Sequence, residues 1–212
     1  MKNIGNVFIL GDSYSTFQGY IPGGYFTWYF RPTQTDTDVL EVTQTWWHQL
    51  LEKTKSNLVL NCSFSGSTIC YTEREEDGYK GTSFCHRLSK LISDGFFKEN
   101  EIDTFFIFGG TNDSWLGVPL GEIMYGEKTE QDLYSLFPAF CYLIEKIKEN
   151  CKNARIITVV NTDLKPEISN MMNEVSNHYN TEVINLSGIT KQSGHPNVKG
   201  MGQIYSQIFE KL

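Results

Sequence analysis

Five short apolar runs are the feature that most constrains the fold of this sequence. Each is too short for a helix and rich in strand-forming residues, and segments with helical spacing of apolar residues alternate with them. Buried strands that alternate with helices form a parallel sheet covered on both faces, with right-handed crossovers. The pattern therefore predicts an α/β fold, a three-layer α/β/α sandwich around a five-stranded parallel sheet. The predicted strands are Val7–Leu10, Leu58–Cys62, Asp103–Phe108, Arg155–Val160 and Glu182–Leu186.

Helices are expected between and after these strands, at residues 43–55, 83–97, 130–150, 167–179 and 198–212. Pro138 lies inside the third of them and should bend or divide it. Loops are expected at 14–32, 71–82 and 114–128, where glycine, proline and aromatic residues replace any regular period. The sequence contains no repeat, low-complexity tract or linker. A chain of 212 residues is long enough to bury roughly 70% of its unfolded surface, so one domain over residues 1–212 is predicted.

The charge balance argues against polyanionic partners. The net charge is −7, and no run is rich in lysine or arginine, so neither nucleic acid nor an anionic membrane surface is an expected partner. No stretch approaches the ~18 apolar residues of a transmembrane helix. The first ten residues make a poor secretory signal, and five cysteines at irregular spacings are typical of reduced thiols. Both observations lead us to expect a cytoplasmic protein.

Several motifs of well-known enzymes are absent from the sequence. It has no GxSxG nucleophile elbow, no P-loop, no HExxH and no CxxC. The segment Gly200–Gly202 lacks a preceding strand and a third glycine, so it is not a dinucleotide-binding fingerprint. We therefore expect no metal ion and no cofactor.

Polar residues follow four of the predicted strands. Ser13, Gly66 and Asn112 follow the first three strands, and His195 follows the fifth. Because the carboxyl ends of parallel strands meet at one edge of a sheet, these residues should gather there. They match the needs of acyl transfer: a serine nucleophile, a histidine base, and donors for an oxyanion from the Ser13 and Gly66 N–H groups and the Asn112 amide. Taken alone, Asp12 and Ser13 are equally explained by an Asx or serine turn.

These residues resemble the conserved blocks of the SGNH (GDSL-type) hydrolases. Gly11–Ser13 is similar to the GDS block, Gly66 to the second block, Gly110–Asp113 to the GxND block and His195–Pro196 to the last block. The blocks occur in the family's order and extend over nearly the whole chain. The resemblance implies a flavodoxin-like fold and an esterase, lipase or carbohydrate deacetylase that needs no metal. It also implies that Ser13, His195, Gly66 and Asn112 are catalytic.

The last block departs from the family pattern at one position. The family places an aspartate three residues before the histidine, and Gln192 stands there in this sequence. A histidine base needs a partner at Nδ1 that fixes its tautomer. The alternatives are Gln192, a backbone carbonyl near Ser193, and Asp163 at the end of the fourth strand. We expect a Ser13–His195 dyad with a neutral orienting group and modest esterase activity.

The sequence leaves the substrate and part of the chemistry open. The expected substrate is a small-molecule ester, glycan or lipid that carries an O-acyl or O-acetyl group. Aromatic residues at 14–30 and from Trp115 to Tyr125 either cover the core or line the substrate pocket, and Asp12, Tyr14 and Trp115 are the predicted substrate-binding residues. Two alternatives to hydrolysis stay open: a weakened enzyme that binds a glycan or lipid without turnover, which Gln192 favours, and an O-acyltransferase.

Overall fold

A five-stranded parallel sheet organises the computed structural model, which describes residues 2–30, 35–73 and 79–212. Its strand order is β2-β1-β3-β4-β5, the order of flavodoxin-like folds. The predicted fold class is therefore confirmed. The strands are β1 (Asn6–Gly11), β2 (Asn57–Ser63), β3 (Thr104–Phe108), β4 (Arg155–Val160) and β5 (Glu182–Asn185).

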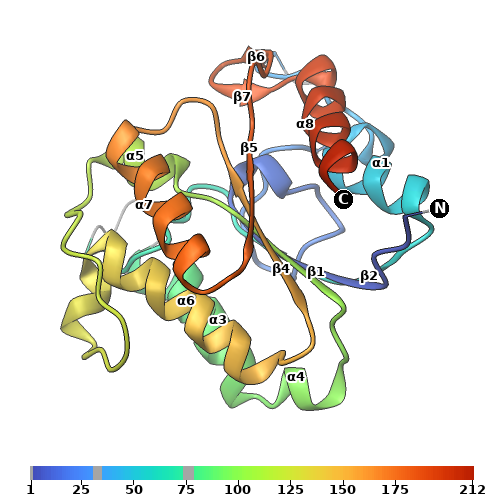
Figure 1. The fold of residues 1–212 in the computed structure, drawn as a ribbon. Helices are drawn as coiled ribbons and strands as arrows, with labels where there is room; N and C mark the ends of the chain where they lie inside the picture. The colour runs from blue at the N-terminus through green and yellow to red at the C-terminus, as the bar shows by residue number, and fades with distance from the viewer. Residues whose placement is uncertain (1, 31–34, 74–78) are drawn as a thin grey trace.

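Helices cover both faces of the sheet, as Figure 1 shows. Successive residues of a strand point to opposite faces. Phe8 and Leu10 of β1 accordingly pack with α3, α6 and α7, whereas Val7 and Ile9 pack with α1 and α8. The main helices are α1 (Trp46–Thr54), α3 (Phe84–Ser93), α6 (Leu136–Asn150), α7 (Pro166–His178) and α8 (Val198–Lys211). None of the helices in the described ranges is long and apolar enough to cross a membrane.

The structure corrects the predicted boundaries of two helices. Instead of one helix at 130–150, a short 3-10 helix (Gln131–Tyr134) precedes α6, and Pro138 lies in the first turn of α6. Proline is tolerated there because the first N–H groups of a helix have no partner within it. The helix predicted at 83–97 ends at Ser93, and Gly95, with φ of +78°, starts the separate α4 (Phe96–Glu99).

Two further short helices occupy predicted loops. The start of the loop predicted at 114–128 belongs to α5 (Thr111–Leu116), and Tyr79–Thr82 of the loop predicted at 71–82 forms α2. Elements of this length are too short for hydrophobic periodicity to reveal. The predicted loops at 14–32 and 71–82 include positions 31–32 and 74–78, which lie outside the described residues.

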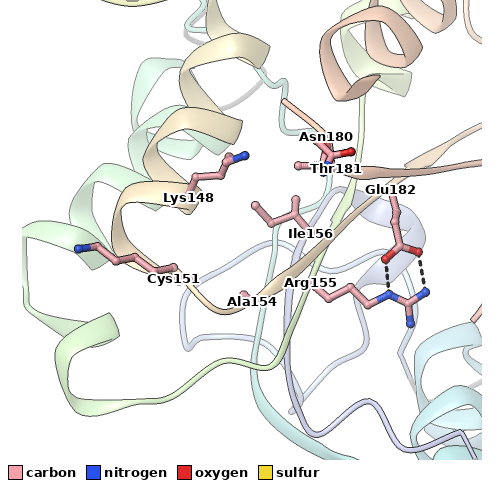
Figure 2. A pocket seen from close by; sticks show the side chains of 9 residues that line it. Lys148, Cys151, Ala154, Arg155, Ile156, Asn180, Thr181 and Glu182 are labelled. Atoms are coloured by element: carbon pink, nitrogen blue, oxygen red, sulfur yellow. Dashed lines mark hydrogen bonds and ion pairs between the residues drawn. The ribbon is translucent and has the colours of Figure 1, made fainter. Parts of the chain in front are cut away.

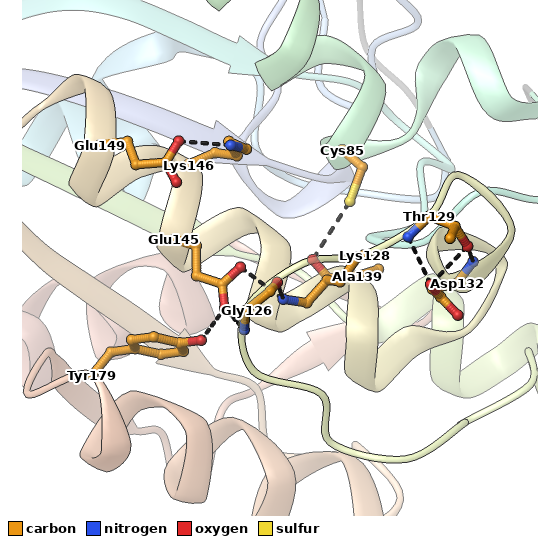
Figure 3. Close-up of polar contacts among 10 residues, drawn as sticks. All are labelled: Cys85, Gly126, Lys128, Thr129, Asp132, Ala139, Glu145, Lys146, Glu149 and Tyr179. Atoms are coloured by element: carbon orange, nitrogen blue, oxygen red, sulfur yellow. Dashed lines mark hydrogen bonds and ion pairs between the residues drawn. The ribbon is translucent and has the colours of Figure 1, made fainter.

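Polar contacts join the segment after α5 to α6 (Figure 3). Lys128 Nζ lies 2.7 Å from Glu145 Oε2, and the lysine side chain is 1% exposed. The N–H of Gly126 donates to the same carboxylate at 3.0 Å, and the Tyr179 hydroxyl of the chain after α7 also donates to it. One carboxylate of α6 therefore joins this segment to two helices.

A pocket of about 200 Å³ lies at the amino-terminal edge of β4 and β5 (Figure 2). It is bordered by the end of α6 and by Arg155 and Glu182, which form a two-pronged ion pair across the strands. None of the predicted site residues lines it. The predicted residues belong to the opposite, carboxyl-terminal edge.

Candidate active site

The carboxyl ends of β1, β2 and β3 lie level with one another. Gly11, the last residue of β1, pairs with Ser63 of β2 on one side and with Phe108 of β3 on the other. From β1 the chain adds β2 on one side of the sheet and β3, β4 and β5 on the other. Folds of this kind bind ligands at this switch point, between β1 and β3. The loops that carry Ser13, Gly66 and Asn112 therefore leave the sheet at the same edge.

A tight turn after β1 sets the position of Ser13. Ser13–Ser15 form one turn of 3-10 helix, capped by Asp12, whose Oδ1 accepts the N–H of Tyr14 at 3.0 Å. The carbonyl of Ser13 accepts from both the N–H and the hydroxyl of Thr16, at 3.2 Å and 2.9 Å. Three short-range bonds thus hold the turn from which the Ser13 side chain projects.

The Ser13 side chain meets His195, 182 positions further along the chain. Its Oγ lies 2.9 Å from His195 Nε2, and His195 Nδ1 lies 3.0 Å from the carbonyl of Ser193. Because a carbonyl oxygen can only accept, Nδ1 carries the proton of the neutral ring and Nε2 is free to accept from Ser13. Of the three alternatives that the sequence offers for Nδ1, the structure has the backbone carbonyl of Ser193 at this position.

The two side chains predicted as alternative orienting groups have other partners. Gln192 donates from Nε2 to the carbonyl of Thr35 at 3.1 Å, and Asp163 accepts from Lys191 Nζ. A two-residue turn brings the Ser193 carbonyl to Nδ1 instead. Ser193 and Gly194 both adopt positive φ, of +48° and +77°, which folds the chain back so that this carbonyl faces the imidazole of His195. Of the three alternatives, Gln192 and Asp163 are therefore not at Nδ1 in the structure.

Burial changes the basicity of His195. The side chain is 6% exposed, and loss of solvation lowers its pKa to about 4 from the usual 6.5. The bond to the Ser193 carbonyl raises the pKa and the positive charge of Lys191 lowers it, both more weakly than burial. The ring is therefore neutral, and able to accept a proton, at any pH well above 4.

Three hydrogen-bond donors belong to the loops around Ser13. The N–H groups of Ser13 and Gly66 have no acceptor among the described residues, and Asn112 is 8% exposed at the start of α5. One hydrogen of the Asn112 amide is donated to the carbonyl of Ser67 at 2.9 Å, which leaves the other for a further acceptor. The predicted oxyanion donors thus all keep capacity to donate.

Asp113, the residue after Asn112, was not assigned a role from the sequence. Its carboxylate is buried and accepts the N–H of Ile69 at 3.0 Å and that of Cys70 at 3.4 Å. These bonds tie the loop that carries Gly66 to the first turn of α5. Its position in the GxND block was the available signal. Burial raises its pKa to about 6.

Gly66 itself adopts a φ of +84°, a conformation that side chains rarely take, while a Cβ there would meet no atom within 4 Å. A side chain at this position would therefore strain the backbone rather than collide with a neighbouring residue.

Asp12 and Tyr14 are not placed where substrate-binding residues were predicted. Both are 0% exposed. Asp12 caps the turn, and burial raises its pKa to about 7. The Tyr14 hydroxyl donates to the carbonyl of Gly194 at 2.6 Å and so supports the turn before His195. Both lie in the interior beneath the turn that presents Ser13, and Tyr14 belongs to the apolar core.

Three aromatic rings surround His195, and one of them was not singled out from the sequence. Trp115 is 52% exposed and stands edge-on to the imidazole with centroids 5.9 Å apart, while Tyr14 lies at 5.4 Å. Trp28 stacks in parallel on the ring, with centroids 3.6 Å apart and an angle of 9°. The sequence placed Trp28 in an aromatic loop but could not pair it with His195. Tyr125, in contrast, stacks on His178.

Among the described residues, no group of three or more His, Cys, Asp or Glu side chains could hold a metal ion. The described residues do form a buried serine–histidine pair, and the loops that carry Gly66 and Asn112 leave the sheet at the same edge as Ser13. A family model described as GDSL-like Lipase/Acylhydrolase matches residues 5–212. The chain belongs to the GDSL-like lipase/acylhydrolase family. No curated protein matches the sequence at a significant level.

Solved structures share the fold along the whole chain. A GDSL-like lipase from Bacteroides ovatus is 42% identical, with a TM-score of 0.89 over 99% of this chain and 98% of that one. One from Bacteroides uniformis is 40% identical, with a TM-score of 0.89 over 98% and 95%. An acetyl xylan esterase from Butyrivibrio proteoclasticus shares the fold at 14% identity, with a TM-score of 0.58 over 99% of this chain and 63% of that one.

Proposed function

We propose that this GDSL-like protein hydrolyses carboxylic esters through an acyl-enzyme formed on Ser13. The observation that carries the proposal is the 2.9 Å contact between Ser13 Oγ and His195 Nε2, with Nδ1 held by a carbonyl that can only accept. A serine hydroxyl is a weak nucleophile until a neighbouring base accepts its proton. His195, neutral above its lowered pKa of about 4, is that base.

The first step forms the acyl-enzyme. Ser13 Oγ attacks the ester carbonyl carbon while its proton moves to His195 Nε2, and the carbonyl oxygen becomes an oxyanion. The N–H groups of Ser13 and Gly66 and the free amide hydrogen of Asn112 stabilise that charge. When the tetrahedral intermediate collapses, the bond to the alcohol breaks, and the imidazolium gives its proton to the departing oxygen.

The second step returns the enzyme to its starting state. Water attacks the acyl carbon and gives a proton to Nε2. The tetrahedral intermediate then collapses, the bond to Ser13 Oγ breaks, and the imidazolium returns the proton to Oγ as the carboxylic acid leaves. In serine proteases, replacing the orienting aspartate with asparagine lowers kcat by ~10⁴ because the tautomer is wrong. The carbonyl of Ser193 imposes the right tautomer but supplies no full negative charge. We therefore expect turnover, at a rate below that of an enzyme with a complete triad.

The substrate class that these residues favour is a short O-acyl group, above all acetyl, on a glycan. Ser13 and His195 are 2% and 6% exposed, so little of either residue faces solvent, which favours a small acyl group over a long one. Exposed aromatic faces suit sugar rings. Trp115, 52% exposed, stands beside His195, and Phe26, 68% exposed, packs on Phe64 of the loop that carries Gly66. The similar acetyl xylan esterase acts on such an ester.

A panel of esters with Ser13→Ala tests this proposal. We expect hydrolysis of p-nitrophenyl acetate and release of acetate from acetylated xylan, both abolished by Ser13→Ala, with rates that fall as the acyl chain lengthens. A fluorophosphonate probe should label wild type and Ser15→Ala, whose serine lies two residues along the same turn, but not Ser13→Ala. Full labelling of Ser13→Ala would place the nucleophile elsewhere. A preference for octanoate over acetate would point to a lipid substrate instead.

A further inference from the structure

Trp28 has the closest ring contact to His195 of any described residue. The indole and imidazole planes are 9° from parallel, with centroids 3.6 Å apart. Trp28 is partly buried, and its Nε1 has no acceptor among the described residues. A hydrogen bond from the indole therefore does not account for its place. Among the described residues, the ring contact of Trp28 is the one with His195.

The geometry of the Nδ1 bond shows what such a stack contributes. One hydrogen bond from Nδ1 to the Ser193 carbonyl fixes a single direction in the plane of the imidazole. The ring turns about its Cβ–Cγ bond, and one hydrogen bond tolerates a broad range of angles, so small rotations about that bond still move Nε2 relative to Ser13 Oγ. A flat surface parallel to the ring prevents this rotation. Nε2 must stay within about 3 Å of the serine oxygen to accept its proton.

The backbone of Trp28 is attached to the same residues as the reacting pair. Its N–H donates to Thr16 Oγ1 at 2.9 Å, and that hydroxyl donates to the carbonyl of Ser13 at 2.9 Å. The hydroxyl of the next residue, Tyr29, donates to the carbonyl of Pro196 at 2.8 Å. The indole is therefore held in a fixed relation to the turn that carries Ser13 and to the chain that carries His195.

We propose that Trp28 is a positioning residue, whose indole face holds the His195 imidazole in the plane that directs Nε2 at Ser13. It takes over a task that a carboxylate performs in a complete triad, where a second oxygen and a charge restrain the ring. The inference rests on the proposed function, because it assigns Trp28 to the Ser13–His195 chemistry. It adds a residue that lies outside the four blocks of the family resemblance.

Replacing the indole with an aliphatic side chain tests the inference. In Trp28→Leu we expect kcat for p-nitrophenyl acetate to fall about 10- to 100-fold with KM within threefold. The contact between Ser13 and His195 can still form, but the imidazole then samples several orientations. Water should also reach the uncovered imidazole face, so the acid limb of the pH–rate profile should move up by about one pH unit toward 6.5. Trp28→Phe, which keeps a flat face, should recover kcat to within about fivefold of wild type.

Trp47→Leu is the matched control. Trp47 is also buried in the α1–α8 core with an unpartnered Nε1 among the described residues, but its ring contacts are Tyr20 and His48. It should lower the melting temperature without changing kcat or the pH profile. The inference is overturned if Trp28→Leu keeps the wild-type kcat and acid limb, or if only KM changes, which would make Trp28 a substrate contact.

A readout without turnover separates this inference from the proposed function. NMR titration of His195 should report a higher pKa in Trp28→Leu than in wild type and an unchanged one in Trp47→Leu. If Ser13→Ala remains fully active while the titration shifts as expected, the proposed function fails and the contact with His195 stands. If Ser13→Ala is inactive and the titration of Trp28→Leu equals that of wild type, the role of Trp28 fails alone.

Discussion

His195 works without a carboxylate partner among the described residues, and this sets the character of the base. Burial holds its pKa at about 4, so the ring is neutral and competent over the whole neutral range. A base of low pKa gains little driving force from accepting a proton, since efficiency is greatest when the catalytic pKa lies near the working pH. The same burial that keeps the ring unprotonated therefore limits the rate.

The pH dependence of turnover reports this directly. We expect kcat/KM for p-nitrophenyl acetate to stay level from pH 8 down to about pH 5 and to fall with an apparent pKa near 4. Protonation of Nε2 removes the base, so activity is lost as the pH falls. Circular dichroism at each pH checks that the chain remains folded. A midpoint near 6.5, the value of a solvated histidine, would contradict the burial of this ring.

Among the elements, one carboxylate of α6 holds the end of the segment between α5 and α6. Glu145 accepts from Lys128, Gly126 and Tyr179, and the Lys128 side chain is 1% exposed (Figure 3). The removal of one partner from such a pair leaves a buried charge uncompensated, which costs about 3–5 kcal/mol. An exposed pair one turn away on the same helix, Lys146 with Glu149, contributes about 1 kcal/mol or less.

Two substitutions compare these pairs. Glu145→Gln should lower the free energy of unfolding by about 2–4 kcal/mol, because the amide keeps some hydrogen bonds but leaves Lys128 without a counter-charge. Glu149→Gln, the matched control on the same helix, should change it by about 0.5 kcal/mol or less. Urea denaturation measures both. Equal effects would mean that the Lys128–Glu145 pair is no more stabilising than a surface one.

For the molecule as a whole, two buried carboxyls beneath the active-site edge make stability depend on pH. Burial raises the pKa of Asp12 to about 7 and that of Asp113 to about 6. Arg87, also buried, lowers the pKa of Asp12 by its charge, yet it donates to neutral oxygens of Gly11 and Ser67 rather than to a carboxylate. The folded protein therefore binds a proton at Asp12 and at Asp113 more tightly than the unfolded chain does.

The sign of the effect follows from the direction of these shifts. Between pH 3.8 and about 7 the folded chain keeps a proton on Asp12 that the unfolded chain has released, so stability falls as the pH rises through this window. Asp12→Asn removes this dependence. The free energy of unfolding of Asp12→Asn minus that of wild type should therefore be up to about 4 kcal/mol larger at pH 8 than at pH 4. Asp94→Asn, on the surface, is the control, and a pH-independent difference for Asp12→Asn would contradict the raised pKa.

The sequence by itself determined the parts of this protein that depend on neighbouring residues. Apolar runs such as Val7–Leu10 and the helical spacing between them specified the layers and the parallel sheet, because side-chain periodicity is a local property. The residues after the strands, Ser13 and Asn112 among them, could be located because parallel strands bring their carboxyl ends to one edge. The start of α6 at Leu136 and the short α5 were not predicted, because periodicity does not resolve single turns.

The tertiary structure alone decided which groups are partners at that edge. Ser13 and His195 are 182 positions apart, and Trp28 reaches His195 from a loop without regular period. The sequence offered Gln192, Asp163 and a carbonyl near Ser193 as alternatives for Nδ1, and two residues at positive φ selected the carbonyl of Ser193. Such choices depend on how distant segments pack and on which groups lose water, since burial fixes both the hydrogen-bond partner and the pKa of a side chain.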